Sequence, residues 1–152
     1  MLNLSSAVQA LAGAAGWHVA DPDELGVYHY FLEEGLDMDI QSPDGRLCVM
    51  STDLGDAPSE SDPSASQELR RLGTLAAGIL RSRGSVLSVQ AGRLELFRAF
   101  DLRRASEDDA VREGQAFLND QAWWRSQLGG SAGLGQSFSF GADWFPSEFS
   151  FR

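Results

Sequence analysis

The sequence predicts an α+β domain, a mainly antiparallel five-stranded sheet with three helices in the order α-β-β-β-α-β-β-α, followed by an aromatic C-terminal tail. Apolar residues recur at helical spacing in three stretches, and the stretches between them alternate or are rich in β-branched and aromatic residues, as strands are. Short turn signals join the strands, which favours antiparallel neighbours packed against helices. We place the domain at residues 1–128 and a glycine-rich linker with the tail at residues 129–152.

The first helix begins near the N-terminus and ends at Gly16, a residue that readily takes the left-handed conformation of a helix end. Asn3 or Ser5 can cap its first turn by accepting a hydrogen bond from a backbone N–H. The helix is short and rich in alanine, so it needs a sheet beneath it. Its apolar positions are Leu4, Val8, Leu11 and Ala15.

Three strands follow this helix. Residues 27–33 are aromatic and β-branched, and residues 36–41 alternate apolar with polar side chains, which predicts a strand with one face in water. The Ser-Pro-Asp-Gly sequence at 42–45 predicts a turn into a third strand at 47–50. Residues 51–61 are rich in Asp, Ser, Gly and Pro and predict a flexible acidic loop.

The middle helix has the clearest start and stop signals. Asp62 before Pro63 is typical of a helix start, and Gly84 of a helix end. Its apolar stripe is Leu69, Leu72, Leu75, Ile79 and Leu80.

A second surface of this helix consists of small residues, namely Gly73, Ala76, Ala77 and Gly78. A glycine inside a helix costs about 1 kcal/mol relative to alanine. Close approach of another backbone would offset that cost. Two neighbours fit this requirement, the chain's own sheet or a second helix across a dimer interface.

Residues 86–91 and 93–100 predict two strands joined by a tight turn at Ala91-Gly92. A third helix follows, with Ser106 as its cap, Asp109 three residues later and Gly129 as its stop. Its apolar stripe is Val111, Phe117, Leu118, Trp124 and Leu128.

The net charge of −10 is unevenly distributed, because residues 1–62 carry −11, residues 63–104 carry +5 and residues 105–152 carry −4. An acidic surface argues against nucleic acid as a ligand, since phosphate binding depends on cations. It suits a basic partner or simply solubility. No apolar run reaches the ~20 residues of a membrane span, so we expect a cytoplasmic protein without membrane insertion.

The residues that carry most catalytic and metal chemistry are few and scattered. His18 and His29 fall on different predicted elements, and Cys48, the single cysteine, excludes an internal disulfide or a thiolate zinc site. Asp37 and Asp39 share a strand face, which a solvated surface explains better than a catalytic carboxylate pair. We therefore expect no enzyme activity, no metal and no cofactor.

The chain resembles the class I type III secretion chaperones, the Tir-chaperone family, over roughly Leu4 to Leu128. The resemblance lies in the order of elements, the length of about 150 residues and the acidity. The stretches that carry it are Leu4–Leu11, Leu36-Asp37-Met38-Asp39-Ile40, Pro43-Asp44-Gly45-Arg46-Leu47, Leu69–Leu80, and Val86–Val89 running into Leu94–Phe97. The aromatic tail and the two glycines of the middle helix depart from the family pattern.

This resemblance implies a homodimer that binds the N-terminal segment of a secreted effector and keeps it soluble and ready for export without ATP. By the family pattern, dimers form through the middle helix and adjacent strands, here Leu69, Leu72, Gly73, Leu75, Ala76, Ile79 and Val86. The effector runs as an extended chain over apolar patches of the first helix and the strands, here Leu4, Val8, Leu11, Tyr28, Tyr30 and Leu32. Residues 27–32 have apolar groups on both faces, which suits an edge strand that accepts an added strand.

Two other classes of function stay open. An acidic immunity or inhibitor protein that neutralises a basic toxin or enzyme would share the charge and the lack of catalytic groups. It would bind a folded partner one to one, whereas a chaperone dimer would hold an extended segment. An enzyme would require a pocket that joins His29, Cys48 and a carboxylate.

The tail contains six of the fifteen aromatic residues and little charge. In two Phe-Ser-Phe units, at 138–140 and 149–151, phenylalanine alternates with serine, which suits an extended strand. The tail is too apolar to be left in water, so we expect it to pack on something. It either completes the core permanently or occupies a sheet edge or the effector groove until a client displaces it.

Overall fold

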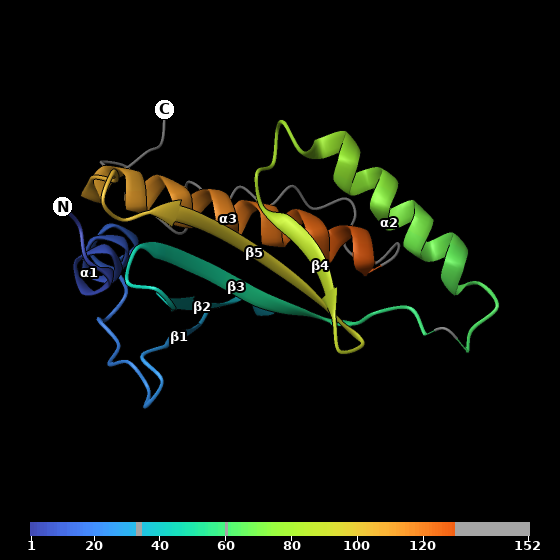
Figure 1. The fold of residues 1–152 in the computed structure, drawn as a ribbon, viewed down its shortest axis with the longest axis horizontal. Coiled ribbons are helices and arrows are strands. Elements are labelled where there is room, and N and C mark those ends of the chain that lie inside the picture. Colours follow the sequence, from blue (N-terminus) through green and yellow to red (C-terminus); the bar gives the residue numbers. More distant parts are fainter. Residues whose placement is uncertain (33–34, 60, 130–152) are drawn as a thin grey trace.

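The computed structural model describes residues 1–32, 35–59 and 61–129, and has the predicted order of elements (Figure 1). Its helices are α1 (Leu4–Ala15), α2 (Ala65–Ile79) and α3 (Glu107–Leu128), and its strands are β1 (Tyr28–Phe31), β2 (Asp37–Gln41), β3 (Leu47–Asp56), β4 (Val86–Gln90) and β5 (Arg93–Asp101). The predicted α+β fold class, with a five-stranded antiparallel sheet and three helices, is confirmed.

The strands lie in the order β1-β2-β3-β5-β4, and every neighbouring pair is antiparallel. β1 and β4 are therefore the two edges of the sheet. One face carries the core, to which the sheet contributes Met38, Ile40, Cys48, Met50, Leu94 and Leu96. The opposite face carries a row that crosses all five strands, His29, Asp39, Ser51, Phe97 and Val86. This row is polar towards β1 and apolar towards β4.

Helices α1 and α3 pack on the core face and against each other (Figure 1). α1 has the predicted caps, since Asn3 accepts a hydrogen bond from the Ser6 N–H and Gly16 is left-handed. Gly114 of α3 lets the two helices approach closely, because a Cβ there would lie 2.5 Å from Cδ1 of Leu11. α3 begins with the predicted capping box between Ser106 and Asp109, so backbone donors of its first turn are satisfied.

The structure corrects the predicted acidic loop at 51–61, because β3 continues as a strand to Asp56. Arg93 of β5 holds the extension through ion pairs with Asp53 (3.0 Å) and Asp56 (2.6 Å). A register shift between Asp53 and Gly55 accommodates an extra residue. The sequence did not predict this part of the strand, because Arg93, which neutralises its acidic side chains, lies 37 to 40 positions away in the chain.

The predicted limits of the middle helix are also too wide. Asp62 does not cap α2 but organises the preceding turn, where its Oδ1 accepts a hydrogen bond from the Ser64 N–H at 2.9 Å. The helix ends at Ile79, whose carbonyl accepts hydrogen bonds from the N–H groups of Ser82 and Arg83. Gly84 is not left-handed, so the expected glycine stop is wrong.

Helix α3 ends at Leu128, with Gly129 as its C-terminal cap. The predictions made for the tail fall on residues 130–152, which lie outside the described residues. The division into a domain at 1–128 and a linker with the tail stays a prediction.

Candidate functional site

Helix α2 lies beyond the edge strand β4, and much of its surface is exposed (Figure 1). Only Ala65 and Leu72 of this helix are buried. Leu69 and Leu80 stay 39% and 59% exposed, and Val86 of β4 stays 42% exposed. Leu69 of α2, Leu80 directly after it and Val86 of β4 thus leave apolar groups in water in this part of the molecule, as interaction surfaces do.

The predicted dimer residues divide into two groups. Leu72 is buried in the chain's own core, and Leu75, Ala76 and Ile79 are half-buried against it. Leu69, Gly73 and Val86 are exposed. Because α2 carries apolar residues on both sides, one side holds it to the core and the other remains available.

The glycines of α2 are not explained by packing within the chain. A Cβ at Gly73 or Gly78 would meet no atom within 4 Å. Close packing on the chain's own sheet, one of the two alternatives, is therefore wrong for the described residues. A neighbouring helix across a dimer interface, the other alternative, stays a prediction.

Asp120 of α3 fixes the start of β4 and is a residue that the sequence analysis missed. Its carboxylate is buried and accepts hydrogen bonds from the Ser85 N–H (3.1 Å), Arg83 (3.3 Å) and Arg98 (3.4 Å). Arg83 also lies over the Trp123 ring, 5.4 Å from its centroid. One signal was present, since Asp120 sits three residues after Phe117 on the buried face of the helix.

The predicted effector-binding residues lie mostly in the core. Val8, Leu11, Tyr28 and Tyr30 are buried, with at most 8% exposure, while Leu4 and Leu32 are half-buried. Val8 and Leu11 line a small apolar hollow between α1 and the sheet. The structure thus brings these two residues together, with strand residues on the other side of the hollow.

Tyr30 has a second contact, with the segment that joins α1 to β1. Its hydroxyl donates a hydrogen bond to the carbonyl of His18 (3.3 Å) and accepts one from the Ala20 N–H (3.2 Å). Its ring lies 5.2 Å from the Trp17 ring. Burial raises the pKa of this hydroxyl. Tyr30 therefore holds the connection in place from inside the core.

The apolar side chains that are exposed at the β1 edge were not among the predicted effector-binding residues. Phe31 of β1 is 86% exposed and Leu25, in the loop before it, is 88% exposed. The alternation of β1 places Phe31 and His29 on the face opposite to Tyr28 and Tyr30. β1 is also an edge strand, with one side unpaired within the described sheet.

His29 lies between two carboxylates on the outer face of β1. Its Nδ1 is 2.6 Å from Asp39 and its Nε2 is 2.7 Å from Asp23. The hydrogen bond to Asp23, then that to Asp39, raises the pKa of His29 above 6.5. The hydrogen bond to His29 in turn lowers the pKa of Asp23 below 3.8. This arrangement ties the loop before β1 to the edge of the sheet.

We expect this tie to weaken at alkaline pH. Because the folded pKa of His29 is raised, its stabilisation is complete below about 6.5 and is lost as the pH rises through the folded value. Asp23 acts in the opposite sense and loses its contribution as the pH falls through its lowered folded pKa. His29→Gln should therefore lower the melting temperature more at about pH 5.5 than at about pH 9.

Thermal unfolding of the variant and of the unchanged protein at the two pH values measures this difference. His18→Gln is a matched control, since no ion pair to His18 is present in the part of the chain that the structure describes. If His29→Gln lowered the melting temperature equally at both pH values, the histidine would act by its shape and not by its charge.

Cys48 and the potential metal ligands are not gathered into one site within the described residues. Cys48 is buried, and burial raises the pKa of its thiol to about 12, which leaves almost no thiolate at neutral pH. No three His, Cys, Asp or Glu side chains within residues 1–32, 35–59 and 61–129 are grouped to hold a metal ion. Among the described helices, none has the length and apolar character to cross a bilayer.

Comparisons with known proteins relate this geometry to a known architecture. No protein-family model and no curated protein matches the sequence. Among solved structures, a chain of the ExsC–ExsE complex matches with a TM-score of 0.61 and 15% identity, covering 84% of this chain and 97% of its own length. The HopA1–SchA chaperone–effector complex contains a chain that matches with a TM-score of 0.59 and 14% identity, over 79% of this chain and 91% of its own.

A third match is a chain from the Yersinia pestis type III secretion chaperone SycH in complex with a fragment of YscM2. Its TM-score is 0.56 at 13% identity, and the match covers 79% of this chain and 98% of its own. The chain has the fold of the type III secretion chaperones. The resemblance seen in the order of elements is thereby confirmed at the level of the chaperone fold.

Proposed function

We propose that this protein is an ATP-independent chaperone of the cytosol that binds the N-terminal segment of a type III secreted effector and keeps it soluble and export-competent. The observation that carries the proposal is the shared fold, which extends over most of this chain. One of the matched chains comes from a chaperone–effector complex. The apolar surfaces at both sheet edges support it, because a protein that holds an unfolded segment needs apolar groups in water.

The client surface that we propose lies at the β1 edge. An extended segment can add to the free side of β1 through main-chain hydrogen bonds, while its apolar side chains contact Phe31, Leu32 and Leu25. The buried residues of the predicted set, Val8, Leu11, Tyr28 and Tyr30, form the floor that positions α1 and β1. The chaperone then acts as a homodimer through α2 and β4, at the opposite edge.

The test uses substitutions of accessible side chains, so that folding and binding can be separated. Leu25→Asp together with Phe31→Asp should reduce capture of the effector segment at least about tenfold, because each carboxylate would lose solvation against an apolar client. We would co-express the chain with the product of the neighbouring gene, capture the complex on a tag, and compare melting temperatures.

Ala99→Asp is the matched control, since Ala99 is an exposed apolar residue of β5, an inner strand away from both sheet edges. It should leave capture unchanged. Full capture by the Leu25 and Phe31 variant would exclude the β1 edge as the client surface. Capture of a folded basic partner in a one-to-one, salt-sensitive complex would favour an immunity or inhibitor protein instead.

A further inference from the structure

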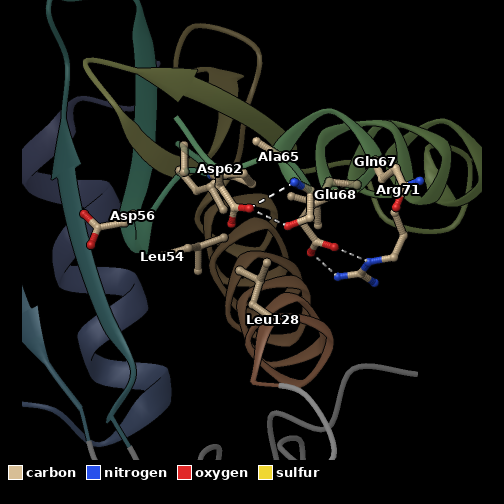
Figure 2. Close-up of a pocket in the computed structure, with 13 residues that line it drawn as sticks. Leu54, Asp56, Asp62, Ala65, Gln67, Glu68, Arg71 and Leu128 are labelled. Atoms are coloured by element: carbon tan, nitrogen blue, oxygen red, sulfur yellow. Dashed lines mark hydrogen bonds and ion pairs between the residues drawn. The ribbon is translucent and has the colours of Figure 1, made fainter. Parts of the chain in front are cut away.

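A cleft separates the first half of α2 from the C-terminal end of α3 (Figure 2). It has a volume of about 620 Å³, within the range of ligand-binding pockets. Its apolar lining includes Leu54, Leu72, Leu94 and Leu128, from β3, α2, β5 and α3. Glu68 and Arg71, which pair at 2.6 Å, stand on the α2 side of the cleft.

This cleft leaves α2 with little support. Leu72 is the one large α2 side chain buried against the core, and the cleft lies beside it. A helix of 15 residues is marginal on its own in water, so it depends on tertiary contacts. A ligand that fills the cleft would join α2 to α3 and to the sheet.

The chain itself supplies a candidate at the mouth of the cleft. Leu128 lines the cleft, and the tail begins two residues later. Phe138 follows Gly129 by nine residues, which span at most about 30 Å when extended, so a Phe-Ser-Phe unit can reach the cleft. Connection by so short a linker gives an effective concentration in the millimolar range.

Charge distinguishes the first Phe-Ser-Phe unit from the second. Residues 130–142 carry no charged side chain, whereas Glu148 directly precedes the second unit. The cleft is lined by Asp56, Asp62 and Glu68, and its one arginine is already paired with Glu68. An uncharged apolar segment therefore suits this cleft better than one that carries a carboxylate.

We propose that residues 136–142 dock in this cleft through Phe138 and Phe140 and thereby hold α2 against the body of the domain. The contact is intramolecular and lies away from the β1 edge, so it stands independently of client binding. Its effect is to set the position of α2, the helix that carries the exposed Leu69 and the glycines Gly73 and Gly78.

Hydrogen exchange of the full-length chain tests this docking. Phe138→Ser together with Phe140→Ser should speed exchange of the α2 amides about tenfold, because the helix opens more often once its support is lost. Phe149→Ser together with Phe151→Ser is the matched control, with the same chemistry in the same tail, and should leave α2 unchanged.

The cleft provides the reciprocal variant. Leu128→Asn should speed exchange in α2 to a similar extent, and adding the Phe138 and Phe140 substitutions should bring little further change, since both act on one contact. No change from the first phenylalanine pair, or equal changes from both pairs, would overturn the proposal. The proposal would also be overturned if protection of the α2 amides rose with protein concentration and did not depend on the tail substitutions. That result would assign the cleft to a second copy of the chain.

Discussion

Leu69→Glu together with Leu80→Glu is expected to convert a homodimer into a monomer. Leu69 of α2 and Leu80, directly after the helix, are both exposed in the single chain, so the fold does not need them. Within a dimer interface each glutamate would bury a charge without a partner, and every 1.4 kcal/mol of that cost weakens the dimer about tenfold. We expect dissociation to become at least about 100-fold more favourable.

Light scattering at micromolar concentration measures this change. The unchanged protein should give about twice the 16.5 kDa chain mass, and the variant the chain mass itself. Leu25→Glu is the matched control, because Leu25 is an exposed leucine in the loop before β1. A variant that keeps the dimeric mass would place the interface away from this side of α2, and a monomeric unchanged protein would exclude the homodimer.

Asp120→Ala is expected to cause the largest loss of stability, about 3–5 kcal/mol, because it leaves buried donors without their acceptor. The Ser85 N–H, Arg83 and Arg98 all bond this carboxylate. Loss of these bonds should also release the start of β4 and with it the connection to α2. Dimer affinity should therefore fall together with stability.

Urea unfolding followed by tryptophan fluorescence measures the free energy of unfolding. Asp56→Ala is a matched control at an exposed aspartate, whose side chain is 85% exposed in its pair with Arg93. Exposed pairs contribute little, so its unfolding midpoint should hardly change. A similarly small change for Asp120→Ala would show that water replaces the lost carboxylate and that the anchor is not essential.

The sequence by itself determined the elements of this fold and their order. Local signals carried that information: Asn3 and Gly16 bound α1, Ser106 and Asp109 start α3, and alternation in residues 36–41 fixes which face of β2 is buried. Each of these signals depends on neighbours within a few positions. The sequence alone therefore contains these signals completely, and they were enough to indicate the chaperone fold.

Only the tertiary structure decided which apolar residues are accessible and which acids have partners. Val8 and Tyr30 looked equivalent to Leu4 in the sequence, yet they are buried, while Phe31 is not. Such differences depend on which face a neighbouring element covers.

The same holds for the acidic residues. Asp53 finds Arg93 across the sheet and Asp120 finds the Ser85 N–H at the start of β4. These pairs join positions more than 30 residues apart in the chain, where no local pattern operates, so the packing of the sheet and helices alone creates them.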